Sequence, residues 1–187
     1  MAKVVSDSTE LMLITLSCIV VATLFLKLKR HHFSYDDNSK MDYNEGLLVV
    51  GLGAIHLFGF YTIMAVLNNG IESKTEILLL LIQIMTIVES TLQSILIIDC
   101  LKMYSKDEKL KKTKPGRSLI TVLILIDVSL WLYETFSAKK YDMNTIQLGY
   151  YDIIFWSIIS SIASPLGIFF RFHASVCLSE IWKNLYE

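Results

Sequence analysis

The sequence has few charged residues and few cysteines, and each shortage excludes a class of protein. Charged residues make up 19% of the 187 residues, whereas a soluble domain usually carries about 25%. The three cysteines, Cys18, Cys100 and Cys177, lie far apart in or beside apolar segments and form no CxxC pair. The sequence therefore predicts neither a zinc site nor a disulfide framework, and the cysteines are expected to be small buried residues.

Motifs of soluble catalysis are also missing. The sequence shows no glycine-rich phosphate loop, no nucleophile–base arrangement and no metal-ligand spacing. Most lysines and arginines lie in two short loops, a placement that indicates membrane orientation rather than nucleic-acid binding. The chain is therefore predicted not to be an enzyme, to need no cofactor or metal, and to bind no nucleic acid.

Long apolar segments dominate what remains, because 53% of the residues are hydrophobic. A helix that spans a bilayer needs about 20 mostly apolar residues. Five segments approach or exceed this length, and the connections between them are short and polar. The sequence thus predicts an all-α, polytopic membrane helix bundle that forms one domain over residues 1–187. The predicted spans are residues 11–27, 46–67, 75–103, 118–136 and 150–171.

The basic residues predict the orientation of these spans. Cytosolic loops of membrane proteins are enriched in lysine and arginine. Thirteen of the 17 basic residues fall on one side if the first loop, the third loop and the C-terminal tail are cytosolic. The C-terminus is therefore expected in the cytosol, and five spans then place the N-terminus outside. An outside N-terminus without a cleavable signal is the arrangement expected of a piece of a longer protein.

Three titratable side chains fall near the middle of three different predicted spans. They are His56, Glu89 and Asp127, and Gln93 follows Glu89 by one helical turn. A charged group at this depth costs about 2.5–3.5 kcal/mol, while one leucine returns only about 0.3–0.6 kcal/mol. The common depth favours a proton-handling site. Structural roles stay open: a protonated carboxyl as a plain donor, a neutral histidine bonded to a carbonyl, and amides that join helices.

Other polar residues lie nearer the ends of the spans. Asp99 and Lys102 fall near the inner end of the third span, and Glu134 near the outer end of the fourth, where ordinary solvation is expected. In the last span, Pro165 predicts a kink. Arg171 is expected to reach the cytosolic headgroups or a carboxylate.

Three stretches of the sequence resemble the otopetrins, a family of proton-selective channels. They are TLQSILIID at 91–99, SLWLYETFSAKKY at 129–141 and, most clearly, SPLGIFFRFHASVCLSEIW at 164–182. Otopetrins end in a similar stretch, which Pro165, Gly167, Arg171 and His173 match here. The family has twelve helices in two halves of six and forms dimers. The resemblance implies that the five spans correspond to its eighth through twelfth helices.

The resemblance also implies a function. Otopetrins pass protons down their gradient, without ATP or a cofactor, through polar and titratable residues within the membrane. The candidate residues here are Gln93, Asp127, Glu89, Asp99 and His56. The expected partners are the lipid bilayer, protons, and a second copy or a complementary N-terminal half, and the expected location is the plasma membrane. The alternatives are a non-conducting assembly or regulatory subunit, a fragment without function, and a proton-coupled transporter.

Overall fold

The structure, a computed structural model, describes residues 2–30, 33–35, 43–71, 73–104, 112–141 and 145–185. Five of its helices are long and apolar enough to cross a membrane, which confirms the predicted all-α class and the number of spans. These helices are α1 (Ala2–Arg30), α2 (Tyr43–Asn69), α3 (Lys74–Leu101), α5 (Arg117–Tyr141) and α7 (Ile153–Asn184).

The helices extend beyond the apolar segments from which they were predicted. α1 begins at Ala2 rather than Leu11, and α7 continues through Pro165 to Asn184. Hydropathy marks only the apolar part of a helix, while polar first and last turns form equally well where their side chains find partners. The start of α3 is set locally, because the Ser73 side chain accepts a hydrogen bond from Thr75 N and the Glu76 carboxylate accepts one from Ser73 N.

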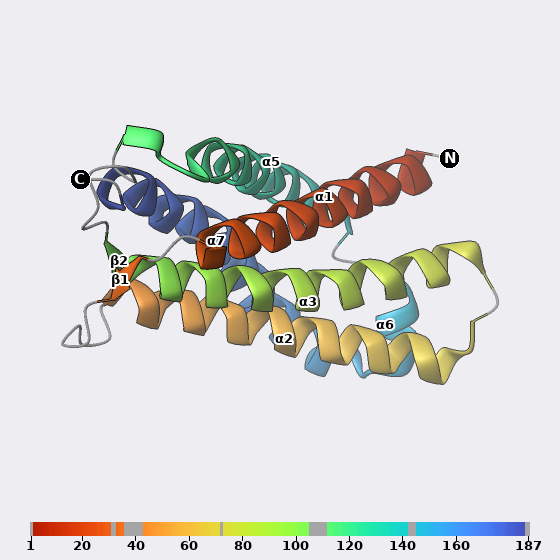
Figure 1. The fold of residues 1–187 in the computed structure, drawn as a ribbon. Helices are drawn as coiled ribbons and strands as arrows, with labels where there is room; N and C mark the ends of the chain where they lie inside the picture. The colour runs from red at the N-terminus through yellow and green to blue at the C-terminus, as the bar shows by residue number, and fades with distance from the viewer. Residues whose placement is uncertain are drawn as a thin grey trace.

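The five long helices form a closed ring. α1 packs on α3, α3 on α2, α2 on α7, α7 on α5, and α5 returns to α1, while α3 and α7 also touch across the middle. The two termini lie at opposite ends of this bundle (Figure 1), as an odd number of spans requires. We call the end near the C-terminus the inner end and the end near the N-terminus the outer end.

Two small elements connect the helices. The strands β1 (Ser34–Tyr35) and β2 (Met103–Tyr104) pair antiparallel at the inner end, where Lys102 also lies 3.7 Å from the buried carboxylate of Glu45. The short helix α6 (Thr145–Tyr150) packs on α2 near the outer end. The contacts of β1, β2 and Lys102 bring the ends of α1 and α3 and the start of α2 to one level.

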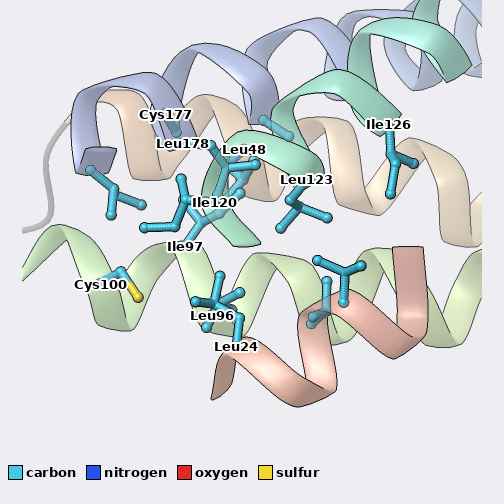
Figure 2. Packing of buried hydrophobic residues seen from close by; sticks show 14 of the residues in the cluster. Leu24, Leu48, Leu96, Ile97, Cys100, Ile120, Leu123, Ile126, Cys177 and Leu178 are labelled. Carbon is cyan, nitrogen blue, oxygen red and sulfur yellow. The ribbon is translucent and has the colours of Figure 1, made fainter. Parts of the chain in front are cut away.

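Aliphatic side chains fill the inner half of the bundle. The cluster draws residues from all five long helices, and those that are essentially inaccessible include Leu24, Leu48, Leu96, Ile97, Ile120, Leu123 and Leu178. Figure 2 shows these side chains gathered between the five long helices, with Leu48 coming from α2. The inner half of the bundle therefore has an apolar core.

Gly51 allows α2 to approach α7 closely. A Cβ atom built on Gly51 would lie 2.9 Å from the Cβ of Phe170, whereas one built on Gly53 would meet no atom within 4 Å. We expect Gly51→Ala to destabilise the bundle, because overpacking costs about 1–3 kcal/mol. Gly53→Ala should leave stability unchanged or raise it by up to about 1 kcal/mol through helix propensity. Thermal unfolding in detergent measures both, and equal midpoints would contradict the close packing of α2 on α7.

Candidate functional site

A fully buried arginine lies between the helices. Arg171 of α7 is 0% exposed, and its Nη1 donates a hydrogen bond to Oε2 of Glu89 on α3 at 2.6 Å. Its Nε donates to Oε1 of Glu134 on α5 at 3.4 Å. Oε1 of Glu89 accepts a further bond from the Ser17 hydroxyl of α1 at 2.6 Å. Four helices thus contribute to one hydrogen-bonded chain.

A second pair lies one turn toward the inner end. Gln93 follows Glu89 by four residues on α3, and its Nε2 donates to Oδ2 of Asp127 on α5 at 2.5 Å. Asp127 interacts electrostatically with Glu89, Arg171 and Glu134, so the pair belongs with the arginine. We call this set the charged cluster; its members are Ser17, Glu89, Gln93, Asp127, Glu134 and Arg171.

Three polar atoms of the charged cluster have no hydrogen-bond partner among the described residues. They are Gln93 Oε1, Asp127 Oδ1 and Arg171 Nη2. Buried polar atoms are normally paired, so three in one place mark a position where polar contacts remain to be made. Oδ1 of Asp127 can bind a proton or accept a hydrogen bond, Oε1 of Gln93 can only accept a hydrogen bond, and Arg171 can only donate one.

The charges of the cluster do not balance when every carboxyl is ionised. Arg171 is its only cation, and it stays charged in proteins, whereas Glu89, Asp127 and Glu134 each carry a carboxyl group. An uncompensated charge in an apolar interior is costly, and two bound protons would make the cluster neutral. The arrangement can therefore hold protons next to a fixed positive charge, which is the chemistry of a proton-binding site.

Polar contacts continue from the charged cluster toward the outer end. Glu134 interacts electrostatically with Glu10 on α1, which also has a hydrogen bond with Tyr133. The Tyr133 hydroxyl lies 2.7 Å from the Ser6 hydroxyl near the start of α1. Because an α-helix rises about 1.5 Å per residue, Ser6 lies about 16 Å outward of Ser17.

The inner side of the charged cluster is apolar. The apolar core described above begins within one turn of Gln93 and Asp127, with Leu96, Ile97 and Leu123 fully or almost fully buried. Asp99 is half-buried beyond this core, where it lines a small crevice with Phe25 and Lys29. Polar groups thus reach the middle of the bundle from outside, and apolar side chains separate them from the inner end.

Comparison with known proteins identifies the fold family. The sequence matches the family model described as Otopetrin over residues 1–172. This chain belongs to the otopetrin family. It is 27% identical over 186 residues to the proton channel OtopLc of Drosophila melanogaster, covering 100% of this chain and 12% of that protein. It is 37% identical over 60 residues to the human proton channel OTOP2, covering 32% of this chain and 11% of the relative. The matched regions therefore cover only 12% and 11% of these relatives' lengths.

The structure of this otopetrin gathers only part of the sequence-predicted set. Glu89, Gln93 and Asp127 lie together, but His56 and Asp99 do not join them. His56 occupies the contact between α2 and α3, where its Nδ1 lies 2.8 Å from the Leu52 carbonyl oxygen.

The residues of the closing motif are likewise divided, because Arg171 belongs to the charged cluster and His173 does not. Arg171 contacts carboxylates rather than headgroups, whereas Nε2 of His173 lies 3.0 Å from the Asn44 carbonyl oxygen at the inner end. Gly167 lies against Ile55 of α2, and the helix remains continuous through Pro165.

Two residues of the site were misjudged or missed in the sequence. Glu134 was expected to be solvated, but it contacts Arg171. Its position seven residues after Asp127, on the same helical face, was the available signal. Ser17 gave no signal, because a serine within an apolar segment is common in membrane helices. Whether Glu134 and Ser17 reach the charged cluster depends on how their helices are rotated about their own axes.

Proposed function

We propose that this otopetrin is part of a proton-selective channel of the plasma membrane and passes protons down their gradient through the charged cluster. In the proposed orientation the outer end faces the extracellular side and the C-terminus lies in the cytosol. One observation carries the proposal: three carboxyl groups and one arginine meet in the middle of the bundle, where Glu89, Asp127 and Arg171 are fully buried and Glu134 is partly exposed. Such an arrangement is expensive in a membrane and usually marks an ion or proton pathway.

The contacts suggest an order of proton transfer. A proton from the outer side would reach Glu134 by way of Tyr133 and Glu10, then Glu89, and then Asp127 beside Gln93. Arg171 would keep a positive charge beside each carboxyl, which favours release of the proton after it binds. Glu134 and Glu89 both bond to Arg171, which stays protonated, so the proton would pass between the carboxyls through water. Such a relay passes protons, and the described residues offer no group of ligands for a metal cation, which would account for selectivity.

The last step toward the cytosol must cross the apolar layer. Leu96, Ile97 and Leu123 separate Asp127 from Asp99, so we propose that conduction requires water to enter this layer, with Asp99 receiving the proton on the cytosolic side. The arrangement shown is then a non-conducting one.

The proposed assembly includes further helices. Only 17% of the apolar membrane-spanning stretch of α7 is buried inside the bundle. This is the lowest share among the five candidate spans in the described chain. Ser157 and Ser161 are exposed on its outer half, and hydroxyls are better placed against protein than against lipid. We propose that a complementary N-terminal half, or a second copy in a homodimer, covers this face.

A transplant into a relative tests the proposed function. Residues 1–187 would replace the matching segment of OtopLc, which supplies the rest of a longer channel protein. We expect acid-evoked proton current from the hybrid and little or none from the chain alone. A folded hybrid without current would contradict the proposal and favour a non-conducting assembly or regulatory role. A current that needs a co-transported solute would favour a proton-coupled transporter.

A further inference from the structure

His56 forms a separate polar site at the contact between α2 and α3, apart from the charged cluster. It is half-buried between α2 and α3, and each ring nitrogen has a partner. Nδ1 lies 2.8 Å from the carbonyl oxygen of Leu52, and Nε2 lies 3.1 Å from Oγ1 of Thr91. Thr91 Oγ1 in turn lies 2.7 Å from the carbonyl oxygen of Ile87, to which it donates.

Counting protons in these contacts shows which form of the ring they fit. A backbone carbonyl only accepts, so Nδ1 must carry a hydrogen to bond Leu52. The Thr91 hydroxyl has one hydrogen, and its bond to Ile87 uses it, so Oγ1 can then only accept from Nε2. All three contacts are satisfied together only when both ring nitrogens carry hydrogens, which is the positively charged imidazolium.

The neutral ring fits the same atoms with one change. If Nδ1 alone carries a hydrogen, the Thr91 hydroxyl can turn its hydrogen from Ile87 to Nε2. The Ile87 carbonyl then keeps its ordinary helical bond and the bond that it accepts from the Ser90 hydroxyl at 3.2 Å. Proton uptake therefore needs a rotation of one hydroxyl hydrogen and no movement of a heavy atom.

The titratable groups that contact α2 lie at its ends, away from His56. At the inner end, Glu45 pairs with Lys102, and Asn44 contacts His173 and Glu180 of α7. At the outer end, the Tyr151 hydroxyl donates to the carbonyl of Tyr61.

Toward α3, the face around His56 carries Thr91, Ile87 and Gln83, whereas Glu89 bonds to α1 and α7. In the described part of the chain, no carboxylate forms an ion pair with His56.

We propose that His56, Thr91 and the Leu52 carbonyl form a second proton-binding site, which holds a proton in acid rather than relaying it. The neighbouring residues Leu57 and Phe60 are 46% and 58% exposed, so the site lies near the surface of the described bundle, on a face that would meet lipid or further helices. A proton bound here would place a positive charge on the face formed by α2 and α3. This assignment does not depend on proton conduction.

Nitrogen NMR of the histidine rings in this chain tests the assignment directly. The chain contains four histidines, so ¹⁵N-histidine labelling in lipid bicelles gives few signals, and His56→Gln identifies the relevant pair. We expect the Nδ1–H form in alkaline solution and the doubly protonated form in acid, because these are the two forms that the observed contacts accommodate. A ring that stays neutral, or that carries its single hydrogen on Nε2, would overturn the proposal.

Thr91 variants separate the site from an ordinary titrating histidine. Thr91→Val keeps the shape of the side chain and removes the acceptor. Bonds to a charged donor are about twice as strong as neutral ones, so the ratio of doubly to singly protonated ring at about pH 5 should fall about fivefold, as expected from about 1 kcal/mol. Thr91→Ser should restore the ratio. Identical ratios in a folded Thr91→Val variant and the parent would refute the role of Thr91, whether or not the chain conducts.

Discussion

Arg171→Met is expected to destabilise the bundle more than any other single substitution in the charged cluster. The change leaves Glu89 fully buried without its cation, and removal of one partner from a buried ion pair costs about 3–5 kcal/mol. In a chain of this size the midpoint of thermal unfolding should fall by about 10 °C. Lys183→Met, an exposed change in the same helix, is the matched control and should leave the midpoint unchanged.

A double variant separates the cost of an unpaired charge from the loss of packing. Glu89→Gln combined with Arg171→Met removes both charges, so most of the lost stability should return, as in other proteins whose buried ion pairs are replaced by neutral groups. Proton current in the OtopLc hybrid should not return, because the relay would lack both its carboxyl and its fixed positive charge. A double variant as unstable as Arg171→Met would show that packing, rather than charge, is the main contribution of Arg171.

Asp127→Asn is expected to remove proton current while the fold persists. Asparagine has nearly the same shape and can still bond Gln93, but it cannot take up and release a proton at this position. Because general proton transfer by a positioned group contributes about 10²–10⁴-fold, the acid-evoked current of the hybrid should fall at least about 100-fold. Asp152→Asn is the control: Asp152 is exposed at the start of α7 and makes no side-chain cap bond. Equal currents in the two variants, at equal amounts of protein on the cell surface, would remove Asp127 from the pathway.

The sequence predicted the helices and the depth of the polar residues, but not the directions in which those residues point. Length and hydropathy were enough for five spans, because a bilayer demands long apolar helices. Depth follows from position along a helix, so Glu89 and Asp127 could be placed at one level. His56 lies at a similar level, yet it faces Thr91 rather than the charged cluster. The rotation of α2 about its axis is set by packing, as where Gly51 meets Phe170, and hydropathy does not report this.

The sequence also could not predict which side chains on different helices contact one another. Glu134 and Ser17 acquire their roles from Arg171 and Glu89, which lie 37 and 72 residues away along the chain. Nothing local distinguishes Ser17 from the other hydroxyls of the apolar segments. Arg171, by contrast, could be singled out in the sequence, because the closing motif resembles that of the family. The structure shows what this residue does physically: it is a buried cation with two carboxylate partners.

The most direct test of the central claim is the reversal potential of the hybrid's current, measured with Glu89 and Asp127 intact and with Glu89→Gln and Asp127→Asn combined. With both carboxyls present, the reversal potential should follow the proton gradient by about 59 mV per pH unit, the value for one charge and a tenfold concentration ratio. With both neutralised, no proton current should remain, although the hybrid still reaches the cell surface. An undiminished current that follows the proton gradient in the double variant would show that protons cross elsewhere, and the charged cluster would then have only a structural role.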